Sequence, residues 1–358
     1  MTRLVLVVPG LLWPAPQMFH PAEDVPHPAL ARLLGRGQPR MEAAVSYEHL
    51  LAQLLGAGPP LPLAALRRLG EGLAQNEDKA HWLCADPVNL SFMGAHVLLD
   101  ELGEDEIDST QAAALIATLN DEFSSLGRFS AATPTRWYLR MEQPAKARFF
   151  PLDEAVCRPV QDFLPTDEES SGSSPACKKE CPEGAEEGGA SHWRHILNEM
   201  QIVLHNHPVN TAREAAGQRP VNSLWLWGSG AQSAFGLPGA PRLAMQASDP
   251  MARGLARAAG IEPDMPDVGK ALRTDTLAVI DTLASSARHL DVTRWQGVFA
   301  VLEQDWFAPI SRALDSGALR HFALHVPGEH ASFSFISGSG ARWRFWRKPL
   351  LLSAVHYP

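Results

Sequence analysis

Apolar and polar positions alternate along the chain in a way that predicts strands separated by amphipathic helices. Residues 4–8, Leu-Val-Leu-Val-Val, form an apolar run of strand length that ends at Pro9-Gly10. Such a continuous run is typical of a central strand in a parallel sheet. Similar runs predict strands at 277–280 and 319–326. Apolar residues at three- and four-residue spacing predict helices at 29–34, 47–55, 63–74, 109–123, 193–207 and 251–259.

Signals for a helix, a turn and a strand follow one another closely in residues 204–230: L-H-N-H-P-V-N-T-A-R-E-A-A-G-Q-R-P-V-N-S-L-W-L-W-G-S-G. Thr211 and Glu214 have the spacing of a capping box for a short helix, which Gly217 closes. Residues 224–227 then predict a buried strand that turns at Gly-Ser-Gly.

Polar side chains gather in the short loops of this stretch. We expect them to lie together beside the carboxyl end of the strand, where open α/β sheets bind ligands. Arginine is suited to bidentate recognition of carboxylate or phosphate. The pattern predicts a pocket for a small phosphorylated or carboxylated ligand, and the alternative is that each side chain caps a helix or satisfies loop backbone. The candidates are His207, Asn210, Arg213, Arg219 and Asn222.

A second group of candidates comes earlier in the chain. Residues 81–90 predict a strand and turn, with Asp86 and Asn89 at the turn. Arg140 closes a further strand at 136–140. These three residues are candidates for the same ligand site, although structural roles are the simpler explanation for each.

Composition limits the possible classes of protein. The chain has 358 residues, of which 45% are hydrophobic, enough for two domains with cores. A net charge of −9 without a block of Lys or Arg argues against nucleic acid as a partner. No apolar run approaches 18 residues and the first residues do not form a secretion signal, so we expect a cytoplasmic protein without a membrane span. Residues 164–190 are acidic and nearly free of large apolar side chains, which predicts a disordered loop, and its Cys177 and Cys181 permit only a weak metal or redox hypothesis.

The motif at 207–222, H-P-V-N-x-x-R-x-x-x-G-x-x-P-V-N, resembles one in the archaeal-type, cofactor-independent phosphoglycerate mutases of the alkaline phosphatase superfamily. With the motifs A-D-P-V, W-Y-L-R and R-F-W-R, the resemblance narrows to a bacterial group described as regulatory proteins of the RpfE type. It implies an α/β alkaline-phosphatase-like core with a mostly parallel sheet, interrupted by a smaller α+β inserted domain. The expected boundaries are 1–78 and 226–358 for the core and 79–225 for the insertion.

The same resemblance implies a site with two metal ions, of which this sequence keeps only part. The family's first strand ends in a metal-binding Asp, where this chain has Pro9. A later Asp-x-x-x-His pair corresponds to Ser285 and His289, and an Asp-His pair to Glu329 and His330. His289, Glu329 and His330 remain as possible ligands for Mn or Zn. Ser46 is the best candidate for the nucleophile, although a serine before a helix is more often its N-cap.

Three hypotheses follow from this incomplete set. The first is a mutase-like protein without mutase chemistry and without a cofactor, which acts in regulation or by binding a small anion. The second is an active metal-dependent phosphomutase or phosphatase with rearranged ligands, dependent on Mn or Zn. The third is an α/β-hydrolase with Ser229 of W-G-S-G-A as the nucleophile, although its elbow lacks the first Gly.

Overall fold

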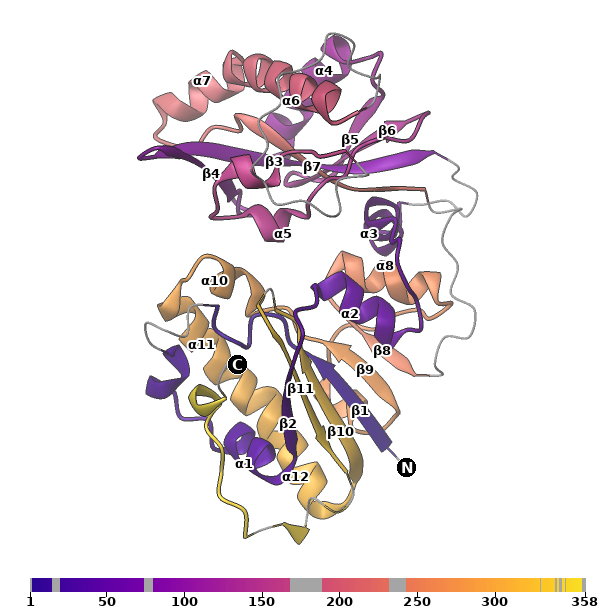
Figure 1. The fold of residues 1–358 in the computed structure, drawn as a ribbon, viewed down its shortest axis with the longest axis vertical. Coiled ribbons are helices and arrows are strands. Elements are labelled where there is room, and N and C mark those ends of the chain that lie inside the picture. Colours follow the sequence, from indigo (N-terminus) through magenta and orange to yellow (C-terminus); the bar gives the residue numbers. More distant parts are fainter. Residues whose placement is uncertain are drawn as a thin grey trace. The chain divides into compact units, whose positions relative to one another are not determined.

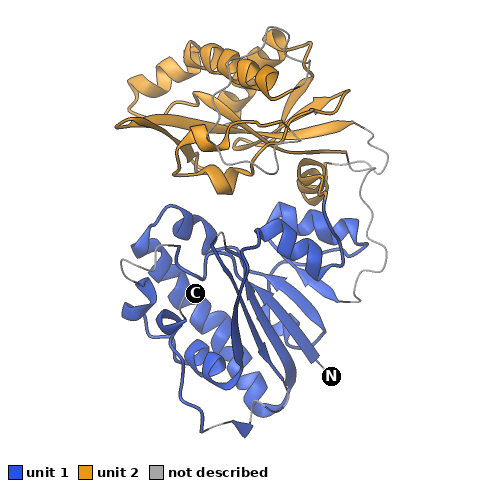
Figure 2. Cartoon of the chain, in the orientation of Figure 1, with its two compact units in different colours: residues 1–59, 236–358 blue, residues 60–235 orange. Residues whose placement is uncertain are grey.

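The structure, a computed structural model, describes residues 2–14, 20–73, 80–167, 189–231, 243–328, 330–338, 340, 343–344 and 346–355. The chain forms two compact units (Figure 2): residues 1–59 with 236–358, and residues 60–235. The second unit is therefore inserted into the sequence of the first. The boundaries predicted at 78/79 and 225/226 differ from these, because the helix that starts at residue 63 and the strand that starts at residue 223 both pack within the second unit.

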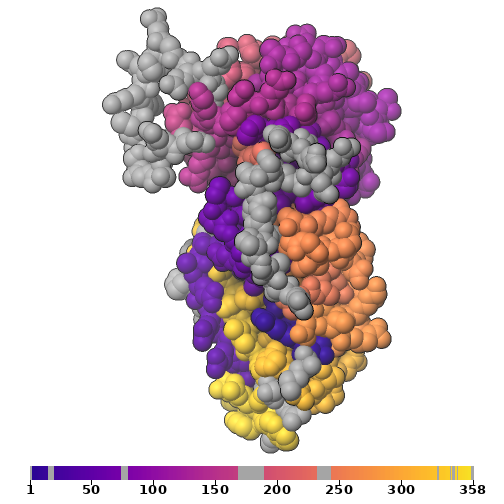
Figure 3. Space-filling model, turned by 90° about the vertical axis from the view of Figure 1, so that its right-hand side faces the viewer, coloured from indigo at the N-terminus to yellow at the C-terminus, as the bar shows by residue number. Residues whose placement is uncertain are grey.

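The first unit contains a six-stranded sheet. Its strands, in spatial order, are β2 (Gln38–Glu42), β11 (Ser332–Ser337), β10 (Leu319–Val326), β1 (Thr2–Val7), β9 (Thr276–Val279) and β8 (Ala244–Gln246). Strand β1 is parallel to both neighbours, with Leu4 opposite Thr276 on one side and Phe322 on the other. This confirms the predicted central parallel strand. In the space-filling view of Figure 3, indigo residues of the N-terminal part and yellow residues of the C-terminal part lie side by side.

Helices cover both faces of this sheet (Figure 1). One face packs against α1 (Pro28–Arg36), α11 (Val292–Leu302) and α12 (Ala308–Ser316), with a π-helical turn, Glu303–Phe307, between the last two. Leu4 and Leu6 of β1 join Trp295 and Phe299 of α11 in this core. Glu303 accepts the backbone N–H groups of Ala29 (2.6 Å) and Leu30 (3.1 Å), so the π turn caps the start of α1. On the other face α2 (Tyr47–Leu54) and α8 (Pro250–Ala258) pack together.

The second unit contains an antiparallel sheet of five strands. They are β4 (His96–Glu101), β3 (His81–Met93), β6 (Arg136–Met141), β5 (Arg128–Thr133) and β7 (Ser223–Gly230), which pairs with β3. Helices α4 (Ser109–Glu122), α6 (Ala190–His205) and α7 (Pro208–Ala215) lie on one face, and α3 (Leu63–Gly70) and α5 (Leu152–Ala155) on the other (Figure 1). Because side chains alternate along β3, Leu83 and Ala85 join the core under α4 and α6, whereas Asp86 faces α3.

The predicted fold class is thus confirmed as α/β, with a mostly parallel sheet and an inserted α+β unit. Most of the predicted acidic loop, residues 168–188 with Cys177 and Cys181, lies outside the described residues. A 3₁₀ turn, Leu352–Ala354, lies near the end of the described residues, and β2 forms the edge of the sheet beside β11. None of the helices in the described ranges is long and apolar enough to cross a membrane.

His20 gives the first unit a pH-dependent stability. It is 8% exposed and its Nδ1 accepts the N–H of Ala22 at 3.1 Å. Burial, with His27 nearby, lowers the pKa of His20 from 6.5 to about 4. Between these two values the unfolded chain binds a proton at this histidine that the folded chain does not, so the free energy of unfolding decreases as the pH falls through this window.

We expect the His20→Asn variant, which keeps a side-chain acceptor for the N–H of Ala22, to show a flatter dependence of unfolding free energy on pH between 6.5 and about 4. Urea denaturation at a series of pH values measures this slope. The exposed His96→Asn is the matched control and should leave the slope unchanged. A slope in His20→Asn equal to that of the unaltered chain would contradict the assignment.

Candidate functional site

Arg213, the centre of the predicted ligand pocket, is held inside the second unit. It is 1% exposed. Its Nε donates to the carbonyl of Arg219 at 2.9 Å, and one terminal nitrogen donates to the carbonyl of Glu106 (2.7 Å) and to Gln111 Oε1 (2.6 Å). The other terminal nitrogen is buried and has no partner among the described residues. Burial lowers the pKa of the Arg213 guanidinium, against the field of Glu106 and Asp108.

Arg219 is also engaged within the chain. It forms ion pairs with Asp100 and Glu106, and its Nε donates to Glu106 Oε1 at 2.9 Å. Partial burial opposes ionisation of Glu106, but hydrogen bonds from Arg219 and from the N–H of Gly103 lower the pKa of its carboxyl. These contacts attach the segment before β7 to β4 and to the loop that precedes α4.

The side-chain amides of the predicted asparagines form hydrogen bonds with backbone N–H and C=O groups. Asn210 is 1% exposed, donates to the carbonyls of Leu204 (2.7 Å) and Val221 (2.8 Å), and accepts the N–H of Val221 at 2.8 Å. Asn222 pairs with both backbone groups of Leu90, at 2.7 and 2.9 Å. Asn89 donates to the carbonyl of Pro220 at 2.9 Å. These amides thus satisfy backbone groups that would otherwise be unpaired.

His207 is the N-cap of α7, and its Nδ1 accepts the N–H of Val209 at 3.1 Å. The predicted capping box at Thr211 is therefore wrong, because Pro208 occupies the first helical position, where its missing N–H costs nothing. Gly217 does close the helix, with φ +71°. The whole group lies at the amino end of β7 in an antiparallel sheet, so its predicted place at a strand's carboxyl end is wrong as well.

Asp86 lies inside β3 rather than at a turn. Residues 81–84 of this strand pair with β6, and residues 88–93 pair with β4. It forms a bidentate ion pair with Arg67 of α3, at 2.7 and 2.8 Å, and both residues are buried. Trp227 Nε1 donates to Asp86 at 2.8 Å, and Arg67 Nε donates to the hydroxyl of Tyr138 at 2.8 Å. This network fixes α3 to three strands, which explains why the second unit begins before α3. Arg140, the last of the predicted residues, is exposed on β6.

In the first unit, polar side chains follow the parallel strands directly. Ser248 and Asp249 come after β8, and Asp281 comes after β9. Ser248 Oγ donates to Asp281 Oδ1 at 3.0 Å, and the hydroxyl of Tyr47 donates to Asp249 Oδ2 at 2.8 Å. Asp249 also caps α8 through the N–H of Ala252 at 2.8 Å. The carboxyl edge of a parallel sheet is the usual ligand-binding edge, so this cluster is the candidate site.

The electrostatics of this cluster are unusual. Burial and the nearby Asp281 raise the pKa of Asp249, against the hydrogen bonds that it accepts. Burial and Asp249 raise the pKa of the Tyr47 phenol. Carboxylates held where ionisation is disfavoured are common in functional sites.

Ser46 stands next to this cluster, immediately before Tyr47. It caps α2, accepting the N–H of His49 at 3.4 Å, and its Oγ lies 2.8 Å from His49 Nδ1. Val45 pairs with Gly328, so Ser46 lies beside the loop that leads from β10 to the exposed His330. The N-cap role of Ser46 is confirmed, and the contact with His49 is an addition that the sequence did not indicate.

Several positions where the resemblance places metal ligands have other contacts in the structure. Pro9 has no ligand atom, and a Cβ on Gly10 would lie 2.7 Å from the carbonyl oxygen of Leu283, so this turn is closed by backbone. His289 Nδ1 donates to the carbonyl of Ser285 at 2.9 Å. Glu329 lies outside the described residues.

Ser229 does not support the hydrolase hypothesis. It lies within β7, whose next residue, Gly230, is opposite Trp82 of β3. A nucleophile elbow requires a sharp turn from a strand into a helix. The prediction of an α/β-hydrolase elbow is therefore wrong.

Comparison with known proteins gives a partial match. No protein-family model matches the chain. The 2,3-bisphosphoglycerate-independent phosphoglycerate mutase 2 of Methanothermobacter thermautotrophicus is 31% identical over 165 residues, 44% of this chain and 35% of that protein. The corresponding mutase of Methanosarcina barkeri is 24% identical over 175 residues, 48% of this chain and 38% of that protein. The chain thus spans little more than a third of the length of these curated relatives.

Among solved structures, the cofactor-independent phosphoglycerate mutase from Thermoplasma acidophilum aligns with a TM-score of 0.47 and 16% identity, over 100% of this chain and 96% of that one. The sequence matches show that parts of this chain are similar, at low identity, to cofactor-independent phosphoglycerate mutases.

Sequence analysis did not identify Tyr47, Ser248, Asp249 or Asp281 as site residues. A signal was present, since Asp281 directly follows a predicted strand. Strand β8 has only three residues and was not predicted, so nothing marked Ser248-Asp249 as the end of a strand.

We expect Asp86→Ala to destabilise the protein by about 3–5 kcal/mol, because it leaves the Arg67 guanidinium buried and unpaired. The double variant Arg67→Met, Asp86→Leu should recover most of that loss. Urea denaturation followed by tryptophan fluorescence measures both, with the exposed Asp121→Ala as the control. A loss below about 1 kcal/mol in Asp86→Ala would argue against the structural role.

Asp249→Asn keeps an oxygen for the Tyr47 hydroxyl and for the α8 cap, and it removes a carboxyl that burial disfavours as an ion. The pKa of Asp249 is higher in the folded chain than its ordinary value of 3.8. Its carboxyl therefore stabilises the fold below pH 3.8, where it is protonated, and this stabilisation is lost as the pH rises through the folded-state pKa. The variant should therefore have a higher melting temperature than the unaltered chain at pH 7, with the gain disappearing below pH 3.8. Asp267→Asn, at the exposed N-cap of α9 (Val268–Ala271), is the matched control, and an equal gain there would contradict the interpretation.

Proposed function

We propose that this chain is a phosphoglycerate-mutase-like protein of the alkaline phosphatase superfamily that does not carry out two-metal phosphoryl transfer. It acts by binding a small phosphorylated or carboxylated compound, in a regulatory role of the kind described for RpfE-type proteins. The observation that carries this proposal is the end of β1. There Pro9 stands where the resembling family has a metal-binding carboxylate, and the backbone of Leu283 closes the adjoining turn.

The neighbouring carboxylates support the same proposal. A two-metal site needs several carboxylates free to hold ions about 4 Å apart. Asp249 instead caps α8 and accepts the Tyr47 hydroxyl, and Asp281 accepts the hydroxyl of Ser248. The proposal takes the ligand class from the phosphoglycerate mutases named above and assigns no cofactor.

The second candidate function is hydrolysis or transfer of a phosphate ester at Ser46. The observation in its favour is the 2.8 Å contact between Ser46 Oγ and His49 Nδ1. A neutral His49 would accept the Ser46 proton as the oxygen attacks phosphorus and the alkoxide leaves. In this alternative His289, Glu329 and His330 would supply ligands for Mn or Zn.

The test is metal content and activity of the full chain, purified without chelator. We expect substoichiometric Mn and Zn by mass spectrometry, and no interconversion of 3- and 2-phosphoglycerate above that of Ser46→Ala. The double variant Glu329→Ala, His330→Ala serves as the metal control. About two equivalents of metal that the double variant loses, or turnover that Ser46→Ala and His49→Ala abolish, would establish the active enzyme instead.

A further inference from the structure

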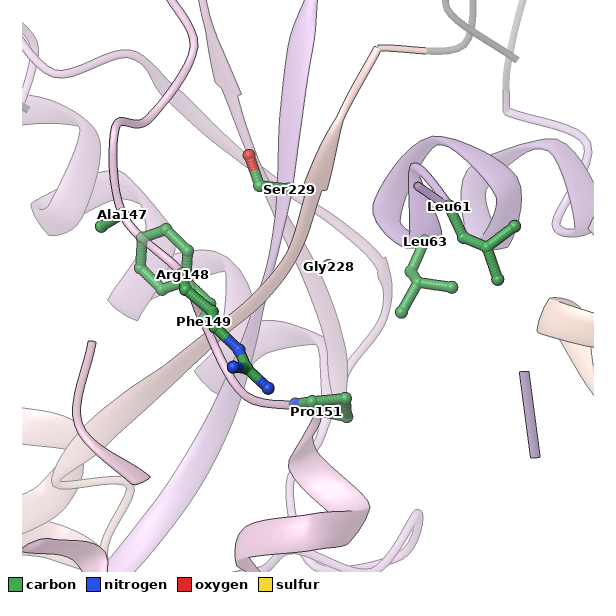
Figure 4. A pocket seen from close by; sticks show the side chains of 8 residues that line it. All are labelled: Leu61, Leu63, Ala147, Arg148, Phe149, Pro151, Gly228 and Ser229. Atoms are coloured by element: carbon green, nitrogen blue, oxygen red, sulfur yellow. The ribbon is translucent and has the colours of Figure 1, made fainter. Parts of the chain in front are cut away.

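A cleft of about 310 Å³ lies within the second unit, and none of the residues predicted to bind the small anion lines it. Figure 4 shows its lining from three segments: the start of α3, the end of β7 and the loop before α5. The lining residues are Leu61, Leu63, Ala147, Arg148, Phe149, Pro151, Gly228 and Ser229. The volume is at the lower end of the range for small-molecule sites, roughly 300–1,000 Å³.

One side of the cleft is formed because β7 ends in glycines. Gly228 has φ +72°, and a Cβ there would lie 3.0 Å from Leu63 Cβ and from the nitrogen of Ala64. A Cβ on Gly230 would lie 2.5 Å from Pro62 Cβ. Only glycine therefore lets the start of α3 approach the strand this closely. The W-G-S-G motif, which does not form a hydrolase elbow, serves to build this wall.

Arg148 is the one cationic residue among those that line the cleft, and hydrogen bonds fix the backbone of its segment. The backbone of Arg148 pairs with Thr166, N–H to carbonyl at 2.8 Å and carbonyl to N–H at 3.1 Å. Its guanidinium carbon lies 5.1 Å from the centre of the Phe150 ring, at cation–π distance. The side chain is nevertheless exposed at the mouth of the cleft (Figure 4). A pre-positioned guanidinium in a cleft is suited to a carboxylate or phosphate.

Apart from Arg148 and Ser229, the side chains that line the cleft are apolar. Leu61 and Leu63 stand on the α3 side in Figure 4, with Phe149 and Pro151 on the side of the Arg148 segment. The Ser229 hydroxyl points away from the Arg148 guanidinium in Figure 4, so Arg148 is the group that would hold the anion. Ligand sites usually combine apolar side chains with a few polar groups that fix orientation.

We propose that this cleft binds a small organic anion, a carboxylate or phosphate carried on an apolar body, with Arg148 at the anionic end. This inference deepens the proposed function, because it gives the small-anion ligand a location and a class. It also accounts for binding without Arg213 and Arg219, whose guanidinium groups bond within the chain.

The test uses four probes on the full chain by isothermal titration calorimetry: phenyl phosphate, benzoate, inorganic phosphate and benzyl alcohol. We expect phenyl phosphate or benzoate to bind, and the other two to bind at least tenfold more weakly, because one lacks the apolar body and the other lacks the charge. Whichever of the two organic anions binds more tightly shows whether the site prefers phosphate or carboxylate. No binding of either at about 10 mM would overturn the proposal.

Variants locate the binding. Arg148→Gln should weaken the best probe about tenfold or more, since it removes a charge-assisted hydrogen bond. Arg148→Lys should keep part of the affinity. Lys146→Gln removes an exposed cation two residues away, outside the lining, and should change nothing. Melting curves of each variant confirm that the fold is intact.

The outcomes separate this inference from the proposed function. Tight binding that Arg148→Gln does not weaken would overturn the cleft assignment and leave a small-anion protein with its site elsewhere. Equal weakening by Lys146→Gln would show general electrostatic attraction and would also overturn it. Phosphoryl transfer by the unaltered chain would overturn the proposed function, while Arg148-dependent binding would still establish the cleft.

Discussion

The parallel pairing of β1 with β9 and β10 is the constraint on which the first unit depends. Six residues at the start of the chain become the centre of a sheet only when segments near residues 276 and 319 lie on either side of them. The unit therefore cannot complete its core before the last third of the chain is present. The inserted residues 60–235 have to form their own core, which they do around an antiparallel sheet. The same pairing gathers the carboxyl ends of four strands at one edge, where Tyr47, Asp249 and Asp281 lie.

In the second unit, buried charge serves mainly to join elements. Arg67 and Asp86 connect α3 to the sheet, and Arg213 and Arg219 connect the segment around α7 to β4 and the loop before α4. Each of these guanidinium groups would suit a phosphate, and each is instead engaged by carboxylates or carbonyls of the same chain. A buried arginine needs partners because desolvation disfavours its charge. Such motifs therefore resemble a ligand site in sequence even where the structure uses them to hold segments together.

The exposed Arg148, by contrast, lines a cleft although no sequence motif marks it. Nothing in its spacing distinguishes it from other surface arginines, and its sequence neighbours give no motif. Its position becomes informative only because Gly228 and Gly230 admit α3 beside β7, and because Thr166 fixes the backbone of its own segment. A site of this kind depends on three segments distant in sequence, so no local pattern predicts it. The Tyr47–Asp249 contact has the same character, since 202 residues separate the two side chains.

The sequence by itself determined the elements whose signals are local. The apolar run at 4–8, the helix at 251–259 and the left-handed Gly217 all follow from nearest-neighbour chemistry. It also determined the α/β class. Tertiary structure alone decided that Asp86 lies within a strand, that β7 joins β3 rather than the parallel sheet, and that Asn210 and Asn222 bond to backbone. The physical reason is that a polar side chain takes its role from the partner that burial gives it, and in a chain whose two ends form one sheet those partners come from segments far apart in sequence.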